Sequence, residues 1–478
     1  MKKPFPASLI LIMLISSCTV GPVYSPPLDE TPAEWHSHIP ATMDTCSAED
    51  LVWWESLQDP LLNQLIECAA AQNLDLQIAA ARVLKARTEA NGKKGDLYPH
   101  IDGSVSGGHV YYSKDALING LLGTTIPSKC RRKTKRHVNY FEIGFDVQWE
   151  IDLFGMTKHE IAALKAQEEA VQEGLCSIWV TLSAEIAKNY IELRSLQSRL
   201  DILQRTIKAQ AEAIVLSQEL LSRGVVNEMD LYKAEAECSV LRAQSPLMEL
   251  GVDRAIHRIS ILLGYVPGEL YECLNVASTL PKLPEKMPIG MPSELLRRRP
   301  DIRKAERELA VATERVGSAV AGLFPRFSLN GFLGEISAHA GSLFTPASAA
   351  WLAGPQLLIP IFNSRLLLQD VEYNKIATQE ALFNYQKVVL EALEESENAI
   401  ASYRYESERL NNLVEAYYKY HKTELLARKL YEEGVHDNLM VIGATKSLLS
   451  SEDILLQSQT SLLLNYVSLY KSLGGTWR

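Results

Sequence analysis

Apolar and polar residues alternate along the stretch 140–152. Successive side chains of an extended strand point to opposite faces of a sheet, so this pattern predicts a strand with two unlike faces. The apolar face carries Phe141, Ile143, Phe145, Val147, Trp149 and Ile151. The polar face carries Glu142, Asp146, Gln148, Glu150 and Asp152. In a soluble sandwich the polar face would meet solvent. In a transmembrane barrel the apolar face would meet lipid, and Glu142, Asp146 and Glu150 would face the water-filled lumen.

Three weaker alternating segments predict partner strands. They begin near Ile101, Phe327 and Trp351. With the stretch 140–152, which has about the length that a tilted membrane strand needs (~10 residues), they give four strands per chain. A closed barrel of this kind needs about eight strands or more. One chain therefore cannot close a barrel alone, and we expect an oligomer.

The helical patterns are unusually long. Residues 174–222 contain no proline and a single glycine, and apolar residues recur there at steps of three and four from Trp179 onwards. This spacing is typical of a coiled-coil seam, and a helix of that length would span about 70 Å. Gly224 predicts a helix-ending turn, after which a second helix returns from about Glu228 to Leu263. Gly434 predicts the same turn in a second hairpin.

The chain repeats this plan. Asp75 and Asp301 lie 226 positions apart, and Gly224 and Gly434 lie 210 apart, each pair at matching points of a helix–strand–strand–hairpin series. Internal repeats of this size indicate duplicated structural units. We expect five segments: a signal peptide (1–17), a lipidated extended segment (18–60), a first repeat (61–264), a proline-rich linker (265–292) and a second repeat (293–478).

Composition narrows the class of protein. The 478 residues are 47% hydrophobic and 22% charged, which is ordinary for a folded chain, and the net charge of -10 disfavours nucleic acid as a general partner. Past residue 17 no apolar run is long enough for a membrane-spanning helix. Six cysteines besides Cys18 are scattered without CxxC spacing, so we expect no metal site, redox motif, disulfide or other cofactor.

The first residues have the pattern of an export signal. Lys2 and Lys3 precede a short apolar run, and two serines precede Cys18. This is typical of a secretory signal. The sequence Ile15-Ser-Ser-Cys18 also resembles a bacterial lipobox, in which the cysteine is acylated, for example with palmitate, and becomes the mature N-terminus. The alternative is a plain signal peptide with an incidental cysteine.

Five short segments in chain order carry a family resemblance. They are Cys18-Thr-Val-Gly-Pro-Val-Tyr24, Trp53-Trp-Glu-Ser-Leu-Gln-Asp-Pro-Leu-Leu62, Trp149-Glu-Ile-Asp-Leu-Phe-Gly155, Arg298-Arg-Pro-Asp301 and Leu473-Gly-Gly-Thr-Trp477. These segments are distributed along nearly the whole mature chain. In them the sequence resembles the TolC-like outer-membrane efflux factors. It is most similar to the lipoprotein branch that serves resistance-nodulation-division pumps.

The resemblance implies an α+β fold and a homotrimer. Twelve strands would form an outer-membrane β-barrel, continued by a periplasmic α-helical barrel. A periplasmic adaptor protein would dock on the hairpin tips at Gly224 and Gly434, which also serve as simple turn glycines, and would link the channel to an inner-membrane pump. The cargo would be drugs, dyes, metals or other small exported molecules.

The predicted gate departs from the family pattern. Gly443 stands where the family often has an aspartate near the second tip, and Lys446 follows it. Asp230 keeps an acidic position after the first tip, and His436 stands where some members have an arginine partner. We therefore hypothesise a pH-sensitive Asp230–His436 link. The alternative is that His436 and Asp437 are merely solvated tip residues.

Other functions fit the sequence less well. Lys129–Arg136 carries six basic residues in eight, but it lacks the aromatic residues of a nucleic-acid module; a solvated loop, or one touching anionic lipid or polysaccharide, agrees better. No catalytic motif indicates an enzyme. A structural or adhesive trimeric lipoprotein is the alternative function, but it would not need two matched strand pairs. A pump adaptor would show one hairpin.

Overall fold

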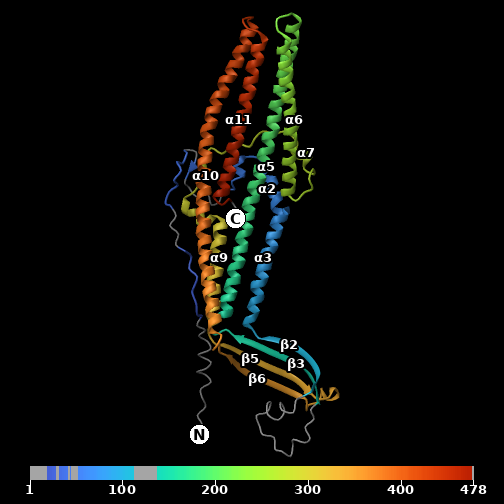
Figure 1. Ribbon diagram of the computed structural model, residues 1–478, viewed down its shortest axis with the longest axis vertical. Coiled ribbons are helices and arrows are strands. Elements are labelled where there is room, and N and C mark those ends of the chain that lie inside the picture. The colour runs from blue at the N-terminus through green and yellow to red at the C-terminus, as the bar shows by residue number, and fades with distance from the viewer. Residues whose placement is uncertain (1–18, 28–31, 41–42, 45–51, 112–136, 476–478) are drawn as a thin grey trace, which may run out of the picture. The chain divides into compact units, whose positions relative to one another are not determined.

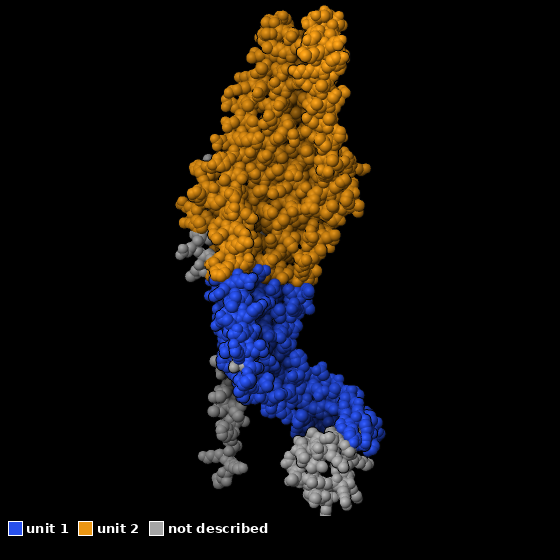
Figure 2. Space-filling view, in the orientation of Figure 1, with its two compact units in different colours: residues 1–26, 85–168, 307–382 blue, residues 27–84, 169–306, 383–478 orange. Residues whose placement is uncertain are grey.

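The computed structural model describes residues 19–27, 32–40, 43–44, 52–111 and 137–475. The expected signal peptide, Cys18 and the basic run 129–136 lie outside the described residues. The chain divides into two compact units (Figure 2), made of residues 1–26, 85–168 and 307–382, and of residues 27–84, 169–306 and 383–478. Each unit takes segments from both repeats that the sequence predicts. The boundaries of those repeats stay a prediction.

The first unit contains a four-stranded antiparallel sheet (Figure 1). Its strands, in spatial order, are β2 (His100–Tyr111), β3 (His137–Ile151), β5 (Arg326–Ser337) and β6 (Ala349–Leu358). All neighbours pair antiparallel, and the central pair joins β3 of the first strand pair to β5 of the second. The four predicted strands are confirmed.

One face of this sheet is largely apolar across all four strands, although Glu335 of β5 also lies on it. In register, Gly103 pairs with Phe145, Phe145 with Leu333, and Leu333 with Trp351. Phe145, Leu333 and Trp351 are 58%, 64% and 77% exposed in the single chain. A continuous exposed apolar face of this kind marks a surface that meets lipid or another protein.

The opposite face carries acidic residues only on β2 and β3, although Ser328 and Asn330 of β5 and Gln356 of β6 are polar. Asp102 on β2 stands opposite Asp146 on β3. The next residues in that row are Phe332 on β5 and Leu352 on β6, and Leu352 is 68% exposed. The acidic face predicted for β3 therefore continues onto β2 but not onto the second strand pair.

Long helices make up most of the rest of the described chain (Figure 1). They are α2 (Pro60–Gln72), α3 (Leu74–Lys93), α5 (Met156–Ser222), α6 (Glu228–Leu262), α9 (Pro300–Ala321), α10 (Ser364–Glu432) and α11 (Asn438–Ser472), with short helices α7 (Tyr271–Leu274) and α8 (Leu295–Arg298). Among the described residues, no helix is both long enough and apolar enough to cross a membrane.

Helix α5 begins earlier than the expected start at residue 174. The Asp152 carboxylate accepts hydrogen bonds from the backbone N–H groups of Gly155 and Lys158, both at 2.9 Å, and so caps the first turn. Gly155 has a φ of 88°, a left-handed conformation that favours glycine. Gly174 lies inside the helix, where one glycine costs only about 1 kcal/mol. That cost does not end a helix of 67 residues.

The core of the second unit gathers aromatic side chains from both ends of the chain. Trp53 is 1% exposed and stacks on Tyr470 with 6.3 Å between ring centroids. The Tyr466 hydroxyl donates to the Trp53 carbonyl at 3.1 Å, and burial raises the pKa of Tyr466 well above its usual range. The short strands β1 (Met43–Asp44) and β4 (Met287–Pro288) pair in parallel, and Met43 and Met287 belong to the same hydrophobic core. The N-terminal segment and the linker thus help to close this core.

Free thiols occur at four described cysteines. Cys68 and Cys273 are exposed, Cys176 is half-buried and Cys238 is buried. Burial, followed by the charge of Glu173, raises the pKa of Cys176 to about 11. Such a thiol is protonated at neutral pH and is a poor nucleophile.

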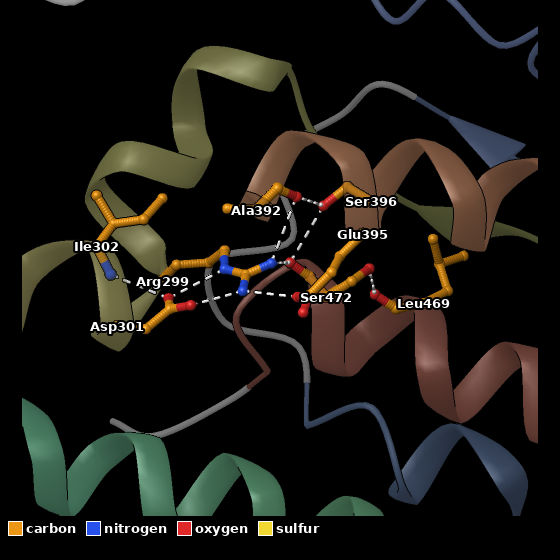
Figure 3. A network of polar contacts seen from close by, with 8 residues as sticks. All are labelled: Arg299, Asp301, Ile302, Ala392, Glu395, Ser396, Leu469 and Ser472. Atoms are coloured by element: carbon orange, nitrogen blue, oxygen red, sulfur yellow. Dashed lines mark hydrogen bonds and ion pairs between the residues drawn. The ribbon is translucent and has the colours of Figure 1, made fainter. Parts of the chain in front are cut away.

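Two returning helices end on matched side-chain contacts within the second unit. The Asn73 side-chain amide donates to the Leu262 carbonyl at the end of α6, at 2.8 Å. Arg299 donates to the Ser472 carbonyl at the end of α11, at 2.9 Å (Figure 3). The last carbonyls of a helix lack partners within the helix, so each contact satisfies one of them.

Candidate functional site: the hairpin tips and the contacts between hairpins

The first tip joins α5 to α6. Gly224 has a φ of 73° and donates its N–H to the Leu221 carbonyl at 2.9 Å, while Val225 donates to Leu220 at 2.9 Å. These two bonds form a C-terminal helix cap. The cap needs one residue in the left-handed conformation, and glycine adopts it without strain. Asn227 then starts α6, its side-chain oxygen accepting the Asp230 N–H at 3.1 Å.

The second tip joins α10 to α11 with the same geometry. Gly434 has a φ of 73° and donates to the Tyr431 carbonyl at 2.9 Å, and Val435 donates to Leu430 at 2.9 Å. Asp437 caps α11 by accepting the Met440 N–H at 3.1 Å. Neither tip glycine has an atom within 4 Å of an added Cβ, so the glycines are required by backbone conformation and not by crowding.

The predicted gate residues have separate placements. Asp230 lies in the first turn of α6, Asp437 is the N-cap residue of α11, and His436 donates its backbone N–H to the Leu430 carbonyl at 3.2 Å. Among the contacts of the described residues within one chain, none joins Asp230 to His436. Their link stays a prediction, and Asp437 has a capping role that neither the gate hypothesis nor the alternative of a solvated tip residue included.

Lys446 instead pairs across the hairpins with Glu237 of α6. Its ammonium lies 2.8 Å from the Glu237 carboxylate, and the Gln210 amide of α5 donates to the same carboxylate at 3.3 Å. The hydrogen bond from Lys446 is the main reason that the pKa of Glu237 lies below its usual value. The carboxylate is therefore charged at neutral pH, and it connects α6 to α11.

Two further ion pairs join α5 to α11. Arg199 holds the Asp453 carboxylate through two nitrogens, at 2.7 and 3.3 Å. Arg205 holds Glu452 in the same bidentate way, at 2.6 and 3.0 Å. Bidentate pairs fix orientation as well as distance. The first hairpin thus contacts α11 of the second at several depths below the tips.

Glu237 was not among the site residues predicted from the sequence. One signal was available, because Glu237 lies 13 positions after Gly224 and Lys446 lies 12 positions after Gly434. In two hairpins of equal length, opposite charges at equal depth below the tips are candidates for a cross-hairpin pair.

The three strand residues expected at the lumen share one face of β3. Glu142, Asp146 and Glu150 alternate with the apolar residues, and Asp146 and Glu150 are exposed while Glu142 is half-buried. Glu142 stands opposite Ser106 of β2, and Glu150 opposite Ser328 of β5. The shared face is consistent with the expectation, whereas the lumen itself belongs to an assembly and stays a prediction.

Comparisons with known proteins agree with this geometry. Residues 65–265 and 291–475 match the family model of the outer membrane efflux protein. The chain is 27% identical to the probable efflux pump outer membrane protein TtgC of Pseudomonas putida, covering 100% of this chain and 96% of that relative. It is also 27% identical to the cation efflux system protein CusC of Escherichia coli, with 98% and 97% covered. The solved outer-membrane channel OprN aligns with a TM-score of 0.85 and 34% identity, over 96% of this chain and 100% of that one.

The chain therefore belongs to the outer membrane efflux protein family. It has the TolC-like fold that its motifs predicted, and it is an outer-membrane channel component of a tripartite efflux system that extends into the periplasm.

Proposed function

We propose that three copies of this chain assemble into a passive exit duct. Three four-stranded sheets would close one barrel of twelve strands in the outer membrane, and the helical hairpins would line a periplasmic tunnel. The exposed apolar row across β2, β3, β5 and β6 carries this proposal. In one chain the four strands cannot close, and the exposed Phe145, Leu333 and Trp351 need a lipid or protein environment.

In this assembly the acidic side chains of β3 face the water-filled lumen. Glu142, Asp146 and Glu150 favour cations near the pore wall, because a lumen lined by one sign of charge concentrates the opposite ion. We further propose that Cys18 is acylated and anchors the chain to outer-membrane lipid. The channel itself performs no catalytic step; an inner-membrane pump supplies the energy for export.

The tips at Gly224 and Gly434 are the proposed contacts for a periplasmic adaptor. Val225 and Val435 follow the two glycines and are 67% and 62% exposed, so a docked adaptor could bury one aliphatic side chain at each tip. Relatives include a toluene efflux pump component and a cation efflux component, so the family relation supports small molecules as cargo without selecting one.

A cross-linking experiment tests the adaptor contact. A photo-reactive amino acid replaces Val225 or Val435 in cells that carry the cognate adaptor, and the adduct is identified by mass spectrometry. We expect a covalent adduct with one periplasmic adaptor at both positions. Val276, which is 65% exposed and follows α7, is the matched control and should give no such adduct. Equal capture at Val276 would contradict docking at the tips.

Native mass spectrometry tests the assembly. Detergent-purified protein should have the mass of three chains, each 53.3 kDa before processing and lipidation. A monomer that retains its sheet would contradict the barrel that we propose.

A further inference from the structure

A cavity lies among α5, α6 and α11 of the second unit. It has a volume of about 610 Å³, within the range of about 300–1,000 Å³ that is usual for small-molecule sites. Its lining is mainly apolar, and includes Ile202, Leu203, Val240, Leu241, Met248 and Leu449. Ile202 and Leu203 of the first hairpin and Leu449 of the second are nearly fully buried and form the apolar wall of the cavity.

Five charged side chains also line the cavity, and four of them are already paired. Arg199 is paired with Asp453 at 2.7 Å, and Lys446 with Glu237 at 2.8 Å. Lys446 and Asp453 are seven residues apart on α11, which is about 10 Å along the helix. The two ion pairs therefore border the cavity at different depths, and their charges cancel locally.

Lys233, which is exposed, is the fifth charged residue of the lining. Within the described part of the chain its ammonium makes no ion pair, although its charge acts on the nearby Glu237 carboxylate. The cavity thus offers an apolar wall and one unpaired cation. A cationic ligand would find no free carboxylate here, whereas a molecule with an apolar body and one anionic group would satisfy both features.

We propose that this cavity binds small amphipathic anions, with the apolar body against the wall and the anionic group at Lys233. The ligand would contact the first hairpin through α5 and α6 and the second through α11. A ligand stabilises whichever arrangement it binds better. Its occupancy therefore stabilises the packing of α11 against the first hairpin.

Two dyes that share an apolar body test the site. Anilinonaphthalene sulfonate carries one anionic group, and phenylnaphthylamine is its uncharged counterpart; both fluoresce more strongly in apolar surroundings. Titrations use the full-length protein in nanodiscs of zwitterionic lipid, with empty nanodiscs as the baseline. We expect anilinonaphthalene sulfonate to bind saturably at one site per chain, with fluorescence above that of empty nanodiscs.

Three substitutions assign the signal to the cavity. Lys233→Met should weaken sulfonate binding roughly five-fold, as expected for a partly exposed ion pair, and leave phenylnaphthylamine binding unchanged. Lys208→Met removes an exposed lysine of α5 that does not line the cavity, and should leave the binding of both dyes unchanged. Val240→Glu puts a charge into the lining and should weaken both dyes. Circular dichroism confirms that each variant keeps its helices.

Two results would overturn the proposal. One is sulfonate binding by the wild type no greater than by empty nanodiscs, which would mean that a neighbouring chain fills or covers the cavity. The other is an equal loss of both dyes in Lys233→Met, which would leave only an apolar groove without anion recognition. Neither result bears on the proposed exit duct, because dye binding measures neither export nor conductance.

Discussion

The two helical hairpins have nearly identical backbones but different side-chain chemistry where they end. Gly224 and Gly434 share a φ of 73° and the same two closing hydrogen bonds. At the other end of the returning helices, Gly264 and Gly474 also have positive φ and again donate three residues back along the chain. These glycines therefore end matching helices of the two hairpins with the same type of turn.

The side chains that cap the ends of α6 and α11 differ. Asn73 gives Leu262 one neutral hydrogen bond. Arg299 binds the Ser472 and Ala392 carbonyls and also the carboxylates of Asp301 and Glu395 (Figure 3). Burial by itself lowers the pKa of Arg299, but the bonds to Asp301 and then Glu395 outweigh it and hold that pKa above its usual value. The last carbonyls are thus bound by a neutral group in the first hairpin and, in the second, by a buried arginine whose carboxylate partners are more exposed.

The largest expected effect follows from removing the ionic cap. Arg299→Met removes the ion pairs with Asp301 and Glu395 and two bonds to carbonyls that Ser396 also contacts. Because the two carboxylates are 38% and 61% exposed, we expect a cost of about 3 kcal/mol. Asn73→Ala removes the neutral bond to the Leu262 carbonyl and also the bond from the Leu76 N–H, and should cost about 1–2 kcal/mol. The measurement is the midpoint of thermal unfolding in detergent, from helical circular dichroism at one scan rate. Equal decreases of the unfolding midpoint in the two variants would show that the ionic network at Arg299 stabilises the protein no more than the neutral bonds of Asn73 do.

Alanine at the tip glycines should have a smaller effect that is equal in both hairpins. A residue with a Cβ in the left-handed conformation costs about 1–2 kcal/mol, and no neighbour at either tip adds a clash. We expect Gly224→Ala and Gly434→Ala to lower the same unfolding midpoint by similar amounts. A clearly larger loss at one tip would mean that the two turns are not equivalent in the assembly.

The helix caps after the tips should give effects of about 1 kcal/mol each. Asn227→Ala and Asp437→Ala each remove one bond to a backbone N–H, at 3.1 Å in both cases. The Asp437 charge also interacts with the positive end of the α11 dipole, which adds a few tenths of a kcal/mol at low ionic strength. Added salt should therefore reduce the difference between the variants; a difference that grows with salt would argue against the dipole contribution.

The smallest expected effect is the pH response of the Glu237–Lys446 pair. The pKa of Glu237 is lowered in the folded protein, so this pair contributes stability above the unfolded pKa of about 4.5 and loses it as pH falls through the lower folded value. Because both side chains are more than a third exposed, the contribution is about 0.5 kcal/mol.

Hydrogen exchange of α6 and α11 amides between pH 5 and pH 3 measures this response. Protection at the two helices should fall more steeply in the wild type than in Glu237→Gln, which cannot titrate. Glu228→Gln, in the first turn of α6, is the control and should behave as the wild type. If protection fell equally with pH in the wild type and in Glu237→Gln, the Glu237–Lys446 pair would not be a pH-dependent contact.

The sequence predicts what is local and repeated in this molecule. Period-two alternation placed β3, and glycine in a left-handed turn placed both tips, because each depends on neighbouring residues. It did not predict the Glu237–Lys446 pair or the Asp152 cap of α5. The pair depends on how α6 and α11 pack, and the cap depends on a loop conformation. The sequence also gave no reason to expect Phe332 and Leu352 on the face that is acidic in β2 and β3, since a strand's pattern does not report its neighbour's register.

The most direct test of the channel is its ion selectivity in planar bilayers under a salt gradient. Purified wild-type protein should insert with discrete conductance steps and a reversal potential that favours cations. Asp146→Lys, on the polar face of β3, should move the reversal potential towards anions, whereas Lys208→Met should leave it unchanged. Membrane-inserted trimers that conduct no ions, or a reversal potential that Asp146→Lys does not move, would contradict an acidic, water-filled lumen formed by this sheet.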